Sequence, residues 1–169
     1  MGRVAGLFLF LALALPARAA APICTVVTAA PAPDMVEHVT CDQSAISRYF
    51  LLSPALASLS SAERAAVVSD PLRYALAFMA ADARDRLQAG FADDRTQSVD
   101  LTETLVGRGP KGAPVAHVLF RLRPARADAA AIDWKNLAPL DLFKTFPSEL
   151  SPYLLDGLKP KPAAKPASP

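Results

Sequence analysis

The segment DPLRYALAFMAADARDRLQAG, residues 70–90, decides how this chain folds. Asp70 is a preferred N-cap residue, and Pro71 suits the first helical position, where a missing N–H costs nothing. Gly90 suits the left-handed position just past a helix end. With helical periodicity, one stripe collects Leu72, Ala75, Leu76, Met79, Ala80, Ala83 and Leu87. We therefore expect a helix over residues 70–90 that lays one apolar face on the core.

Two further pairs have helical spacing on this segment. Tyr74 and Phe78 lie off the stripe and four residues apart, which predicts packing against a neighbouring helix or the C-terminal segment. Stacking of a ligand is the alternative for these two rings. Asp82 and Arg86 have the spacing of an ion pair within one helix.

Strand-like segments flank the helix on both sides. Residues 23–29 and 35–41 read as a β-hairpin around a Pro-rich turn, and residues 96–106 and 114–123 read as a second one. Asp42 caps a short helix over residues 43–52, and a capping box beginning at Ser60 opens another over 61–69.

The second hairpin has a predictable register. If Val106 faces Val115, then Leu101 and Glu103 share an apolar face with Phe120, and a slip of one residue would spoil that face. The opposite face then carries Asp100 across from Arg121 as an ion pair.

These elements predict an α+β fold, an antiparallel sheet from two β-hairpins with a central helical segment packed on one face. The expected single domain spans residues 20–158, and the strand order stays open. Residues 133–158 carry many large apolar side chains and should wrap the core as a lid, with a helical turn over 152–156; an exposed part would bind a partner. Residues 159–169 form a disordered Lys/Pro tail.

Residues 1–19 have the three parts of a secretory signal peptide. Arg3 gives the positive start, residues 4–15 are apolar, and Ala17 and Ala19 form an A-x-A cleavage site. The apolar run is too short to span a membrane. We expect an exported protein, periplasmic or secreted, and the frequent Ala, Arg and Pro favour a bacterial periplasm.

The charge of the expected domain argues against a nucleic-acid binder. Of the 18 basic residues, Arg3 and Arg18 lie in the signal peptide, and Lys159, Lys161 and Lys165 lie in the tail. The remaining 13 face 16 acidic residues, a net charge of −3.

Cys24 and Cys41 are the only two cysteines, and both lie in the exported part. An oxidising compartment predicts a Cys24–Cys41 disulfide that stabilises the fold by about 3 kcal/mol on the chain-entropy model. A redox role would favour a C-x-x-C pair, which is absent, and no residues have the spacing of metal ligands. No metal or cofactor is expected.

Glu103 is a candidate buried carboxylate because it falls in the middle of the apolar face of the second hairpin. Such a group needs a partner, reaches an edge of the sheet, or has a raised pKa, and raised pKa values occur often at functional sites. The competing interpretation is a structural partner such as Arg48 or Arg73, or a strand end open to water.

A candidate binding surface comes from five basic residues with no acidic residue among them: Arg108, Lys111, Arg121, Arg123 and Arg126. Such a patch could attract an acidic protein or an anionic lipid or cell-wall surface. The alternative is an ordinary solvated hairpin whose charges prevent edge-to-edge pairing.

No catalytic motif or phosphate-binding loop is present, and the two histidines, His38 and His117, lie on different hairpins. A triad of His117 with Asp100 would have to be assembled by the fold. We therefore expect a non-catalytic binding or interaction protein acting on an envelope protein or polymer. One alternative is a small hydrolase or lyase using Glu103; another is a carrier of an apolar ligand beside Met79 and Phe120.

Overall fold

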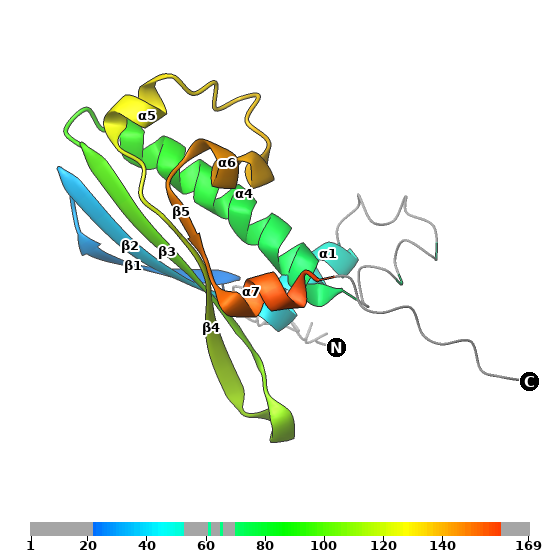
Figure 1. Ribbon diagram of the computed structural model, residues 1–169. Helices are drawn as coiled ribbons and strands as arrows, with labels where there is room; N and C mark the ends of the chain where they lie inside the picture. Colours follow the sequence, from blue (N-terminus) through cyan, green and yellow to red (C-terminus); the bar gives the residue numbers. More distant parts are fainter. Residues whose placement is uncertain (1–21, 53–60, 62–64, 66–69, 160–169) are drawn as a thin grey trace, which may run out of the picture.

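The computed structural model describes residues 22–52 and 70–159, together with Ser61 and Ala65 (Figure 1). The expected signal peptide, nearly all of the helix over 61–69 and the tail beyond Lys159 lie outside the described residues. The described strands are β1 (Cys24–Ala30), β2 (Asp34–Asp42), β3 (Ser98–Arg108), β4 (Pro114–Leu122) and β5 (Ser148–Leu150). The helices are α1 (Gln43–Leu52), α4 (Pro71–Ala92), α5 (Arg126–Ala130), α6 (Leu142–Thr145) and α7 (Pro152–Gly157), with 3-10 turns at Pro110–Gly112 and Pro139–Asp141.

The five strands form one sheet in the order β1-β2-β3-β4-β5, and α4 packs across one face of it (Figure 1). This confirms the predicted α+β class. The sheet is mixed, however, because β2 and β3 pair in parallel and join the two antiparallel hairpins. A parallel pair needs a long crossover connection, and the helical segment between the hairpins provides it.

Helix α4 buries the predicted stripe and adds Phe91 to it. Its N-cap is Asp70, whose side chain accepts a hydrogen bond from the Arg73 N–H at 3.3 Å. The predicted end at Gly90 is wrong, since the helix continues to Ala92. A Cβ at Gly90 would lie 2.6 Å from Met35 Cε, so this glycine permits close packing on β2 within the helix.

The flank of α4 packs against α1, as predicted for its two aromatic rings. The Tyr49 and Phe78 centroids lie 5.3 Å apart, and those of Phe50 and Tyr74 lie 5.6 Å apart, both edge to face. The Asp82–Arg86 ion pair is also present, at 2.5 Å.

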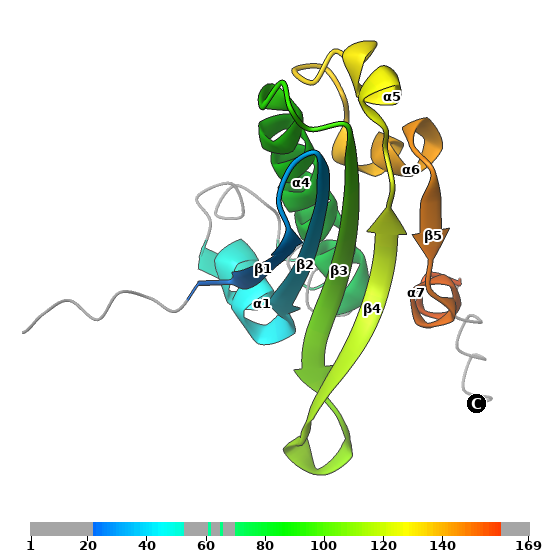
Figure 2. The same cartoon turned by 90° about the vertical axis from the view of Figure 1, so that its left-hand side faces the viewer.

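The register of the second hairpin differs from the prediction. Val115 faces Gly107 in the outer half, and past a bulge Phe120 faces Glu103. The bulge turns both Leu119 and Phe120 into the core, where each is fully buried. The outer half of the hairpin extends past the helices (Figure 2), so burial fixes its register less strictly there.

The C-terminal segment wraps the core, which confirms the lid. Leu142, Phe146 and Leu154 are buried against the sheet and α4. The helical turn predicted after Ser151 is α7, and Ser151 Oγ accepts a hydrogen bond from the Leu154 N–H at 3.2 Å. Strand β5 was not predicted. None of the helices among the described residues is both long enough and apolar enough to cross a membrane.

Candidate functional site

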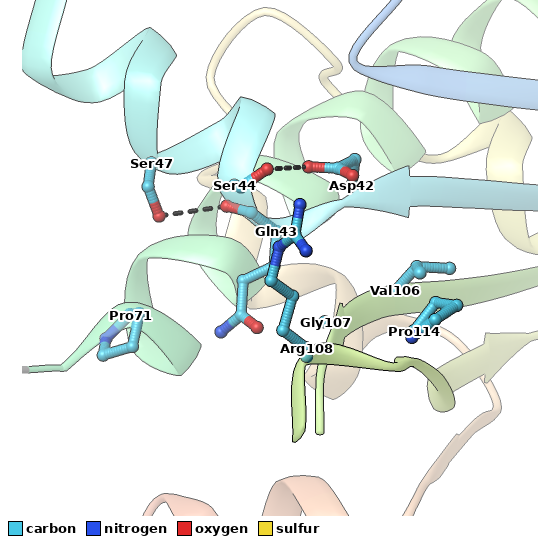
Figure 3. A pocket seen from close by; sticks show the side chains of 10 residues that line it. Asp42, Gln43, Ser44, Ser47, Pro71, Val106, Gly107, Arg108 and Pro114 are labelled. Carbon is cyan, nitrogen blue, oxygen red and sulfur yellow. Dashed lines mark hydrogen bonds between the residues drawn. The ribbon is translucent and has the colours of Figure 1, made fainter. Parts of the chain in front are cut away.

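An open groove of about 550 Å³ lies between the start of α1 and the outer half of the β3–β4 hairpin (Figure 3). Its polar lining consists of Asp42, Gln43, Ser44, Ser47 and Arg108. Val106, Gly107 and Pro114 contribute from the hairpin, and Pro71 from the start of α4. The groove therefore combines donors, acceptors and one cation over an apolar floor.

The groove exists because β2 ends before β3 does. Asp42 is the last residue of β2 and pairs with Val106, after which the chain turns into α1. Strand β3 continues to Arg108, so within the described part no strand pairs with Gly107 and Arg108 on the β2 side. A Cβ at Gly107 would lie 2.5 Å from Gln43 Oε1, which shows how closely α1 approaches β3 here.

Asp42, the acidic residue of the groove, already accepts hydrogen bonds from the first turn of α1. Asp42 Oδ1 accepts hydrogen bonds from Ser44 Oγ at 2.5 Å and from the Ala45 N–H at 2.7 Å. The hydrogen bond from Ser44, followed by that from Ala45, holds the pKa of Asp42 below its usual value. Asp42 is thus the N-cap of α1, as predicted. Of the charged side chains that line the groove, Arg108 is the one left to interact with a ligand.

Arg108 is exposed, and its side chain extends from β3 toward the start of α1 (Figure 3). Lys111 is exposed at the hairpin tip beside it, with φ 67°. Among the described residues, no carboxylate forms an ion pair with either side chain. These two members of the candidate basic surface lie together on the molecule.

The other three basic residues are engaged in the fold. Arg121 Nε donates to Asp100 Oδ1 at 2.5 Å, and Arg123 Nη1 lies 3.0 Å from Glu149 Oε1. The predicted Asp100–Arg121 pair therefore exists, although it is diagonal because Arg121 faces Thr102. The hydrogen bond from Arg121 lowers the pKa of Asp100, with further lowering by the charges of Arg121 and Arg123.

Arg126 lies away from the hairpin, at the C-terminal end of α4. Its Nε donates to the Thr96 carbonyl at 2.5 Å, and its Nη2 donates to the carbonyls of Phe91 and Asp93. The guanidinium also covers the Phe91 ring at 5.9 Å from the centroid. The five basic residues therefore do not form one surface. They lie at the outer part of the hairpin, beside Asp100 and Glu149, and at the end of α4.

Glu103 is fully buried on the sheet face beneath α4. Among the residues that the structure describes, Oε1 of Glu103 has no hydrogen-bond partner, and neither Arg48 nor Arg73 forms an ion pair with the carboxylate. The interpretation that Arg48 or Arg73 is the structural partner of Glu103 is therefore wrong. Both arginines are exposed on their helices, whereas β3 directs Glu103 into the core. Burial raises the pKa of Glu103 to about 9; the charges of Asp82 and Glu37 add to the increase, and Arg86 opposes it.

The predicted Cys24–Cys41 disulfide is present and closes the open end of the β1–β2 hairpin. Glu103 Oε2 lies 3.9 Å from Cys41 Sγ. A disulfide sulfur carries no hydrogen, so in this contact only a protonated Glu103 carboxyl group could act as a donor. The buried acid and the disulfide thus form one cluster under α4.

The two histidines lie at separate places in the described structure. His117 stacks on Tyr153 at 3.8 Å and faces Leu105, about 16 Å along β3 from Asp100; His38 is exposed on β2. Three of the better-formed pockets among the described residues have linings that include none of Glu103, Met79 and Phe120. The part of the chain that the structure describes contains no group of three or more His, Cys, Asp or Glu side chains that could hold a metal ion.

The groove residues Gln43, Ser44 and Ser47 were missed by sequence reasoning. Their sequence context is that of an ordinary amphipathic helix start, and only the parallel β2–β3 pairing places them beside Arg108. Comparison of the chain with protein-family models, curated proteins and solved structures gives no match.

Proposed function

We propose that this chain is an exported, non-catalytic binding protein that captures an acidic, extended segment of an envelope protein. The observation that carries the proposal is the open groove between α1 and the β3–β4 hairpin, with Arg108 on its wall and Lys111 beside it.

The chemistry of the groove favours an acidic polypeptide. Arg108 and Lys111 offer positive charge, and charged groups at the rim of a site mainly attract and select a partner. Gly107 and Arg108 offer strand backbone beyond the end of β2, where an extended peptide can pair. An anionic envelope polymer would use the charge but not the strand edge, which distinguishes the two partners.

Export and the absence of catalysis have separate support. The signal-peptide pattern of residues 1–19 and the Cys24–Cys41 disulfide both suit an oxidising compartment. A hydrolase using Glu103 would need an opening to that carboxyl group, and a carrier would need space beside Met79 and Phe120. The described pockets provide neither, so the binding function is preferred.

The test is the affinity for a fluorescent ten-residue peptide rich in Glu and β-branched residues, measured by anisotropy at low salt. The double change Arg108→Glu and Lys111→Glu should weaken binding about tenfold, since two exposed ion pairs contribute up to about 1 kcal/mol each. Raising the salt concentration should weaken binding of the unaltered protein in the same way.

The matched control is the double change Lys135→Glu and Lys144→Glu, which alters the net charge equally at exposed sites between α5 and β5. An equal loss of affinity in the control would contradict a site at the groove. Binding of inorganic polyphosphate but not of the peptide would assign the site to an anionic polymer instead.

A further inference from the structure

We propose that the Cys24–Cys41 bridge is a thiol–disulfide exchange site, with Glu103 as the proton donor to the departing Cys41 sulfur and a protein dithiol as the reaction partner. This inference concerns a different place from the groove and does not rest on the binding function.

The fold makes the two sulfurs unequal. Cys24 lies on the edge strand β1 and is partly exposed, whereas Cys41 is fully buried on β2. The two residues face each other directly across the hairpin although 17 positions separate them in sequence. Cys24 is thus the more exposed of the two cysteines. A thiolate should therefore attack its sulfur first, which makes Cys41 the leaving group.

A buried leaving group needs a proton. A Cys41 thiolate would hold a negative charge in an apolar core, and burial of this kind raises the pKa of a thiol. Glu103 Oε2 lies 3.9 Å away, and its Oε1 has no other partner to satisfy. The carboxyl group is thus placed and free to donate to the sulfur.

Burial keeps Glu103 protonated at neutral pH, and the charges around it do not reverse this effect. Asp82 and Arg86 face it from α4, and Glu37 faces it from β2. Arg86 Nε is bound to Asp82 Oδ2 at 2.5 Å, so its charge is already compensated. Burial then dominates and raises the pKa of Glu103 to about 9, so the carboxyl group holds a proton that it can donate at neutral pH.

The reaction balances as follows. A thiolate of the dithiol attacks Cys24 Sγ, a new S–S bond forms, and the Cys24–Cys41 bond breaks with its electron pair on Cys41 Sγ. Glu103 gives its proton to that sulfur and becomes a carboxylate. The second thiolate of the partner then displaces Cys24 Sγ, which takes a proton from water. Glu103 regains a proton from solvent once the broken bridge no longer closes the end of the hairpin. The dithiol is oxidised by two electrons and the bridge is reduced.

The test uses the full chain without denaturant and dithiothreitol as the dithiol. Reduction is followed by alkylation and mass spectrometry from pH 6 to 10, and each rate is divided by the concentration of dithiothreitol thiolate. The normalised rate should be constant near neutral pH and fall as Glu103 ionises near pH 9. Glu103→Gln should be about a hundredfold slower at pH 7, with a flat profile, because general acid catalysis is lost.

Glu149→Gln is the matched control, since it removes a carboxylate of β5 that is 65% exposed, and it should keep the original profile. Equal normalised rates and profiles for the protein and Glu103→Gln would overturn the proposal. A normalised rate of the unaltered protein that rises with pH would also overturn it. The bridge would then be exposed by local unfolding, which becomes easier as the ionisation of Glu103 lowers stability.

Discussion

Glu103 pairs across the sheet with Val39 on one side and Phe120 on the other, so its carboxyl group has apolar neighbours in both directions. The alternation of apolar residues along β3 predicted this inward position. It could not predict the absence of a cationic partner, because that depends on where Arg48 and Arg73 end up in three dimensions. The disulfide was predictable because only one pairing of two cysteines exists.

The ionisation of Glu103 should make the protein less stable as pH rises. The folded state holds the proton up to a pKa of about 9, whereas the unfolded state releases it near the ordinary glutamate pKa of 4.5. The free energy of unfolding therefore falls between these values by up to about 1.4 kcal/mol per pH unit. Glu103→Gln should be more stable than the unaltered protein by about 3 kcal/mol at pH 7.

The measurement is urea unfolding of both proteins at pH 5, 7 and 8, with Glu149→Gln as the exposed control. The advantage of Glu103→Gln should shrink toward pH 5, where the acid is neutral in the folded state and little ionised in the unfolded one. Parallel stability curves for the two proteins would contradict a buried neutral Glu103.

At the scale of elements, helix α4 was predicted from its N-cap, its first proline and its apolar stripe. Its end was not, because glycine has two uses that look alike in a sequence: it can terminate a helix or permit close contact. Gly90 serves the second use, since it permits the close contact with Met35 while the helix continues past it. The end of α4 is instead completed by Arg126, whose sequence context suggested only a surface charge.

Arg126→Ala should lower the free energy of unfolding by about 2 kcal/mol, because hydrogen bonds from a charged group contribute about 1.5–3 kcal/mol and these are partly buried. The affected acceptors are the carbonyls of Phe91, Asp93 and Thr96. Arg126→Lys should recover part of the loss, since an ammonium cannot reach all three.

Urea unfolding measures this effect, and Arg108→Ala is the control because Arg108 is exposed at the groove. The control should unfold at the same urea concentration as the unaltered protein. If Arg126→Ala kept full stability and lost affinity for the acidic peptide instead, Arg126 would belong to the binding surface.

At the scale of the whole molecule, the α+β class and the two hairpins were predictable from local patterns. The way the hairpins join was not, because parallel and antiparallel neighbours both satisfy the alternation of apolar residues on β2 and β3. The groove depends on this join, since it forms where β2 stops and β3 continues. Its residues could therefore not be selected from the sequence.

Export carries a prediction for the entire chain. When it is expressed in a bacterium, cleavage after Ala19 should leave a mature protein that begins at Ala20. Intact-mass spectrometry of the periplasmic fraction checks this, and Ala17→Glu should block processing by placing a large charged residue in the A-x-A site. A cytosolic, unprocessed chain would contradict the predicted signal peptide.

The parallel join between β2 and β3 also sets an order of assembly. During synthesis both strands of the β1–β2 hairpin are complete long before Ser98 begins the next strand. Until then β2 presents an unpaired edge, and such edges recruit strands from other chains. The interval in which residues 43–97 are made is therefore when two unfinished copies are most prone to associate, through the edge that β3 later covers.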